Sequence, residues 1–102
     1  MLELRPTCEH CNKPLPPNSL EARICSYECT FCTICADTVL DNVCPNCGGG
    51  FSPRPIRPRT ERRAGVSLQN QPASSKRVNT RYTHEDIEKF SKSVADIDPA
   101  QR

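Results

Sequence analysis

The sequence predicts a small metal-stabilised α+β domain followed by a disordered tail. The chain has 102 residues, and its eight cysteines all lie between Cys8 and Cys47. A segment of about fifty residues without tryptophan and with few large aliphatic residues rarely folds on a hydrophobic core alone. Residues 1–50 carry three basic and six acidic residues, a net −3, whereas residues 51–102 carry eleven and six, a net +5. Such an asymmetry is typical of a domain with an appended interaction tail.

The domain is expected to span residues 1–52. Residues 1–7 form a short lead, and "PLPPNSLEARICSYECTFC" predicts a proline-rich loop and then a short hairpin. The run "TICADTVLD" is compatible with a helix, and "CPNCGGG" consists of turn residues. The apolar positions of the hairpin are Leu20, Ile24, Tyr27 and Phe31. The expected inner face of the helix is formed by Ile34, Val39 and Leu40.

The second half is expected to hold one ordered element. Residues 53–82 are predicted to be a disordered, basic linker, because proline and arginine alternate in "SPRPIRPRTERR" and the rest is polar. Residues 83–97 predict a short amphipathic helix, with Thr83 and Asp86 placed as a capping box. Its apolar stripe is Ile87, Phe90 and Val94. Residues 98–102 are expected to be disordered.

The cysteines are best interpreted as metal ligands. The N-terminus lacks the features of a secretory signal and no run is long enough to cross a membrane, so we expect a cytoplasmic protein. In a reducing compartment, dense cysteines indicate metal binding more than disulfides. Eight thiols suit two tetrahedral zinc sites, with an iron–sulfur cluster as the less favoured alternative.

Local chemistry indicates how the eight thiols divide. The CxxC pairs at the two ends resemble zinc knuckles, and each is followed by a residue that tolerates positive φ, Asn12 or Gly48. The pair "CTIC" opens the predicted helix, where free N–H groups stabilise thiolates. A knuckle facing such a pair is a treble-clef arrangement. The first site is therefore assigned Cys8, Cys11, Cys32 and Cys35, and the second Cys25, Cys29, Cys44 and Cys47.

The full cysteine pattern resembles a known class of zinc domain. Its order, C-x2-C, C-x3-C-x2-C-x2-C, C-P-x-C, resembles the cross-brace of RING fingers, with Cys29 where most have histidine. More closely, "MLELRPTCEHCNKPLPPNS" and "ARICSYECTFCTICADTVLDNVCPNCGG" resemble the bacterial domain of unknown function 1272, over about residues 1–58. That resemblance implies a zinc-type module without an established activity.

Several other interpretations are weaker. The spacing from Cys25 to Cys32 resembles the cluster motif of radical S-adenosylmethionine enzymes, but this chain is too short for their barrel. A ubiquitin-ligase-like role is disfavoured because His10 and Gly48 stand where ligases commonly have an aliphatic and a cationic residue. A thiol redox or zinc-sensing role remains an alternative. We expect His10 to face solvent and not to replace a cysteine ligand.

We therefore expect a protein without catalytic activity that binds partners. The first hypothesis is a protein–protein adaptor, in which the helix stripe docks either on a partner or on its own zinc domain. The second is a nucleic-acid-associated protein held through the basic linker by backbone phosphates. The candidate phosphate or acidic-surface contacts are Arg54, Arg57, Arg59, Arg62 and Arg63.

Overall fold

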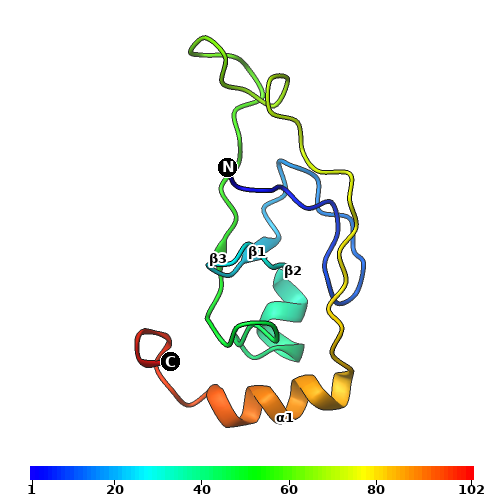
Figure 1. The fold of residues 1–102 in the computed structure, drawn as a ribbon, viewed down its shortest axis with the longest axis vertical. Helices are drawn as coiled ribbons and strands as arrows, with labels where there is room; N and C mark the ends of the chain where they lie inside the picture. Colours follow the sequence, from blue (N-terminus) through cyan, green and yellow to red (C-terminus); the bar gives the residue numbers. More distant parts are fainter.

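The protein is an elongated molecule with its secondary structure gathered in the lower half of Figure 1. The structure is a computed structural model that describes residues 1–102, and it measures 46 × 27 × 18 Å along its principal axes. Its elements are β1 (Ala22–Ile24), β2 (Thr30–Cys32), η1 (Cys35–Val39), β3 (Ser52–Pro53), α1 (His84–Val94) and η2 (Pro99–Gln101). Residues near 60–70 project at one end, and α1 lies across the other end (Figure 1).

A three-stranded antiparallel sheet with the order β2-β1-β3 forms the centre. The expected hairpin is present as β1 and β2, with Ala22 opposite Cys32 and Ile24 opposite Thr30. The third strand, β3, pairs with β1 and was not predicted from the sequence. It is two residues long and ends at Pro53, as suits an edge strand, because proline cannot donate to a further strand.

Thiols occupy much of the space that apolar side chains fill in larger domains. Six of the 11 buried residues in the core cluster are cysteines. The largest apolar members are Phe31, Leu15, Leu40 and Ile87, and Phe51 meets the edge of the Phe31 ring at a centroid distance of 5.4 Å. The thiol clusters thus help to form the core directly.

The inner face expected for residues 33–41 is wrong at Ile34, which has 62% of its surface exposed. Two apolar residues of the hairpin region, Leu20 and Tyr27, are also exposed. Ile34 precedes η1, a single turn of π-helix that buries Cys35 and Ala36. The turn presents a thiol inward and leaves the neighbouring isoleucine outside, because the cysteine cluster lies on its inner side.

The expectation of a disordered tail is not supported. Residues 53–82 follow a defined path, first beside β1 and later beside the N-terminal lead. On the return, the amide of Ser74 donates to the carbonyl of Leu4, and that of Thr80 donates to the carbonyl of Glu9. The physical reason is that the lead forms no strand with the sheet, so its carbonyls accept hydrogen bonds from the tail. Residues 98–102 contain the 3₁₀ turn η2.

Helix α1 packs against the cysteine-rich domain of the same chain. Thr83 caps its N-terminus and forms a reciprocal capping box with Asp86. Ile87 is 2% exposed and belongs to the core cluster, whereas Phe90 remains 38% exposed and Val94 is half-buried. Helix α1 therefore docks in cis, on the domain of its own chain. None of its helices has the length and apolar character needed to span a bilayer.

Candidate metal centres

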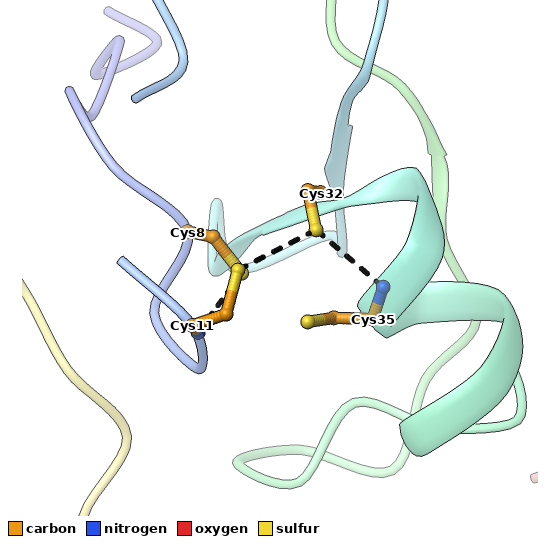
Figure 2. A group of neighbouring side chains, drawn as sticks. All are labelled: Cys8, Cys11, Cys32 and Cys35. Atoms are coloured by element: carbon orange, nitrogen blue, oxygen red, sulfur yellow. Dashed lines mark hydrogen bonds between the residues drawn. The ribbon is translucent and has the colours of Figure 1, made fainter. Parts of the chain in front are cut away.

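The first cysteine cluster joins the N-terminal knuckle to the end of β2 and the start of η1. Cys8, Cys11, Cys32 and Cys35 place their Sγ atoms within 4.8 Å of one another, and all four converge on one point in Figure 2. The Cys11 and Cys32 sulfurs are 3.7 Å apart. The structure thus brings together the four thiols that the sequence assigned to the first site.

Both pairs of this cluster have the same local geometry. The amide of Cys11 donates to Cys8 Sγ, and the amide of Cys35 donates to Cys32 Sγ, each at 3.5 Å. Asn12 follows the first pair with a φ of 64°, in the left-handed region that asparagine tolerates. Amide donors directed at sulfur favour the thiolate, the form that binds metal.

The donor set fits a divalent metal ion. Burial raises the pKa of the Cys8 thiol. Burial, and then the neighbouring Cys32 thiol, raise the pKa of Cys35 well above its ordinary value. Four thiolates therefore cannot coexist here without a compensating positive charge, and all eight cysteines of the chain are free of disulfides. A bound cation would supply that charge and hold the four thiolates in a tetrahedral arrangement.

His10 contacts the cluster, whereas the sequence suggested only a solvent-facing residue. Its Nδ1 lies 3.4 Å from Cys35 Sγ, and its ring centroid lies 6.3 Å from that of His84, the first residue of α1. The histidine takes no cysteine's place in the cluster. It can instead donate to a metal-bound Cys35 sulfur, as outer-sphere groups do at many metal sites.

The second cluster joins the β-hairpin turn to the C-terminal knuckle. Cys25, Cys44 and Cys47 have sulfurs within 4.8 Å of one another, and Cys29 stands outside this group. Hydrogen bonds from the Cys29 and then the Cys44 thiols lower the pKa of Cys25 to about 3. The amide of Cys25 donates to the carbonyl of Cys29 at 3.2 Å, so Cys29 is a neighbour that can complete a fourfold donor set. The structure brings together three of the four thiols assigned to the second site and places the fourth beside them.

Amide groups also donate to sulfurs of the second cluster. The amide of Tyr27 donates to Cys25 Sγ at 3.3 Å, and the amide of Gly49 donates to Cys47 Sγ at 3.4 Å. Gly48 has a φ of 82°, a conformation that glycine adopts without strain. The two clusters alternate along the chain, so the segment from Cys25 to Cys35 contributes to both.

Two of the five arginines predicted to contact phosphate or an acidic surface instead form hydrogen bonds within the protein. The prediction is therefore wrong for these two. Arg54 is 4% exposed, and its guanidinium donates to the carbonyls of Arg5, Leu15 and Pro16. Arg57 donates to the carbonyls of Leu2 and Gln71. The Nη atoms of Arg54 thus donate to carbonyls of neighbouring segments, whereas its Nε is buried without a partner. The other three, Arg59, Arg62 and Arg63, are exposed.

Sequence reasoning missed Glu9, a buried carboxylate in the first knuckle. It is 2% exposed, forms an ion pair with Arg5 at 2.8 Å and accepts from the amide of Thr30. Burial raises its pKa. Through these contacts Glu9 connects the first knuckle to β2, the strand that ends at Cys32. The sequence alone does not show whether a carboxylate between two cysteines is buried or exposed to solvent.

A hollow of about 600 Å³ lies between α1 and the second knuckle. Pro45, Asn46 and Cys47 form one wall, and Tyr82 and Phe90 contribute aromatic rings from the other side. Asp86 and Lys89 add one charge of each sign to the lining. The sequence predicted Phe90 as a partner contact, but the pairing of α1 with the knuckle needed the tertiary structure.

The fold and the two clusters define a small cysteine-rich domain with two groups of thiols that can hold metal ions. The chain belongs to the family described as "Protein of unknown function (DUF1272)", which matches residues 1–57. It is also 51% identical over 78 residues to "Uncharacterized protein R02474" of Rhizobium meliloti (strain 1021), a match that covers 76% of this chain and 86% of that protein. A match of that length extends past residue 57 into the basic segment. No solved structure matches the chain.

Proposed function

We propose that this protein is a zinc-binding interaction module, an adaptor whose two metal ions have a structural role. The observation that carries the proposal is the alternation of the two thiol clusters along the chain. Each ion would join segments that are distant in sequence, so both would be needed to fix one domain. Zinc is the favoured metal because clusters of four thiolates match its tetrahedral preference. Eight free thiols suit a reducing compartment such as the cytoplasm.

A structural role for the metal follows from the donor set. Four thiolates fill the coordination of a zinc ion and leave no position for water or substrate. At the second centre this requires Cys29 to join Cys25, Cys44 and Cys47 as the fourth ligand. Six cysteines also lie in the core cluster, so metal binding and folding should be coupled. We therefore propose no catalytic reaction at either centre.

The hollow between α1 and the second knuckle supports a role in protein binding. Tyr82 and Phe90 line it, and Tyr27 is exposed beside Cys29 and Cys47 at an adjoining hollow. Aromatic side chains around a concavity are typical of the residues that dominate binding energy in protein interfaces. The proposed partner is a protein segment that inserts an apolar side chain between the knuckle and the helix.

Metal removal and reconstitution test the structural part of the proposal. Nitrogen-15 NMR spectra of the full chain should lose their dispersion when a strong chelator is added and regain it at two equivalents of zinc per chain. A dispersed spectrum that is unchanged by complete metal removal would contradict the structural role.

Site-specific photo-crosslinking in cells tests the adaptor part. A photoreactive phenylalanine analogue replaces Phe90, and in a matched control it replaces Ser93, an exposed residue of the same helix. The proposal expects one discrete crosslinked protein from position 90 and none from position 93. Identical products from both positions would argue against the hollow as a binding surface.

A further inference from the structure

Residues 58–71 form a closed loop that we call the basic finger. It projects from the end of the molecule opposite α1 (Figure 1). The amide of Leu68 donates to the carbonyl of Pro58 at 2.8 Å and closes its base. A β-bridge between Arg63 and Val66 forms its tip, where Gly65 adopts a φ of 83°.

The finger is braced by its own polar side chains. Glu61 Oε1 accepts hydrogen bonds from the amide of Gly65 at 3.0 Å and from Asn70 Nδ2 at 2.7 Å. The side-chain amide of Gln71 donates to the carbonyl of Gly65 at 2.8 Å. Arg57 joins the base of the finger to the N-terminal lead through the carbonyls of Gln71 and Leu2. The loop is therefore a preorganised surface, unlike a solvated linker.

The cationic side chains of the finger have no acidic partner within the protein. Arg59, Arg62 and Arg63 are exposed, and none of them takes part in any of the five ion pairs of the structure. The one acidic residue of the finger, Glu61, accepts from its own loop. Glu61 offsets only one of the three guanidinium charges, so the finger keeps a net positive charge that an external anion would neutralise.

The part of the molecule that carries the cysteines has the opposite charge. Residues 1–50 carry a net −3, and a zinc ion bound by four thiolates adds −2 at each centre. The finger and α1 lie at opposite ends of the 46 Å axis. A polyanion would thus be attracted to the finger and repelled by the metal-binding body, which restricts the way in which it can approach.

We propose that the basic finger binds the phosphate backbone of a nucleic acid. Guanidinium forks match phosphate oxygens in geometry as well as charge. The finger contains no aromatic residue, so the contact lacks base stacking and is independent of sequence. This inference is separate from the zinc-dependent adaptor function, because none of the finger residues lies in a metal cluster.

Fluorescence anisotropy with two labelled probes of equal length, duplex DNA and single-stranded RNA, tests this inference on the zinc-loaded full chain. The finger variant is Arg62→Gln/Arg63→Gln, and the matched control is Arg77→Gln/Lys92→Gln, which removes two exposed cationic charges outside the finger. The finger variant should weaken binding at low salt by about tenfold or more and reduce the slope of log affinity against log salt by roughly two. The control variant should change both quantities little.

Three outcomes would overturn the inference. One is that the unsubstituted protein binds neither probe at low salt. Another is that both variants lose the same affinity, which would mean that net charge alone governs binding. The last is tighter binding of a labelled poly-glutamate peptide than of either nucleic acid, which would assign the finger to an acidic protein. Zinc content measured on every sample separates these outcomes from a failure of the metal-binding proposal.

Discussion

Replacing Arg54 by methionine should destabilise the fold although the residue lies in a segment that resembles a flexible linker. The buried guanidinium donates to three carbonyls at 2.9–3.1 Å, those of Arg5, Leu15 and Pro16. These carbonyls belong to segments that the sheet does not hold, so one side chain joins the start of the chain, the proline-rich loop and the strand edge. No acidic residue pairs with Arg54, and burial lowers its pKa.

The magnitude follows from the number of bonds and the cost of burying the charge. A hydrogen bond to a charged group contributes about 1.5–3 kcal/mol net, so three give a gross loss of roughly 4–9 kcal/mol. Desolvation of an unpaired guanidinium offsets several kcal/mol of that gain. We expect a net loss of roughly 3 kcal/mol for Arg54→Met, within the upper range for single substitutions.

Thermal unfolding followed by circular dichroism at a fixed excess of zinc measures this effect. For a domain of about 60–100 residues, each kcal/mol shifts Tm by roughly 4–8 °C, so Tm should fall by more than about 10 °C. Arg59→Met is the matched control, because Arg59 is exposed and no hydrogen bond of its side chain is present. Equal Tm values for the two variants would refute the role of Arg54 as an internal clamp.

Two further substitutions test the docking of α1 and the second knuckle. Ile87→Ala removes a buried side chain of the core cluster and should lower the free energy of unfolding, measured with denaturant, by about 2–4 kcal/mol. Val94→Ala, at a half-buried position, should lower it by less than about 1 kcal/mol. Similar losses for the two variants would contradict the cis docking through Ile87. Gly48→Ala forces alanine into a φ of 82° and should cost roughly 1–2 kcal/mol, with weaker zinc binding at the second site in a chelator competition. Gly65→Ala imposes the same strain at a φ of 83° with open space around its Cβ, so zinc binding should not change; an equal effect on zinc would disprove the link between Gly48 and the metal.

The grouping of seven of the eight cysteines could be predicted because metal knuckles have strong local requirements. A CxxC turn needs amide donors directed at sulfur and a following residue in the left-handed region, and Asn12 and Gly48 meet that need. The N-terminus of α1 is similarly local, since Thr83 and Asp86 alone specify the capping box. Features set by a few consecutive residues can be recognised without the tertiary structure.

The contrast between Arg54 and Arg59 could not be predicted for the opposite reason. Both lie in the repeated context "PRP" or "PRT", and composition treats them alike. Burial of Arg54 depends on the carbonyls of distant segments that the fold brings to it. The ordered path of residues 53–82 could not be predicted for the same reason. Composition rules count charges and aromatic residues, but they do not count the unpaired backbone acceptors of distant segments.

Hydrophobic pattern also failed at Ile34, Leu20 and Tyr27, which are exposed. Pattern analysis assumes that apolar side chains fill the core. Here cysteines make up six of the 11 core-cluster residues, so fewer aliphatic positions are needed inside.

Zinc K-edge X-ray absorption on the purified full chain, together with metal content per chain, tests the central claim most directly. The account expects two zinc ions per chain, each surrounded by four sulfurs at about 2.3 Å. We expect the Cys29→Ser variant to lose sulfur from the coordination shell of one centre only. That result would identify Cys29 as the fourth ligand of the second site. One metal per chain, or a first shell containing nitrogen from His10, would contradict the account.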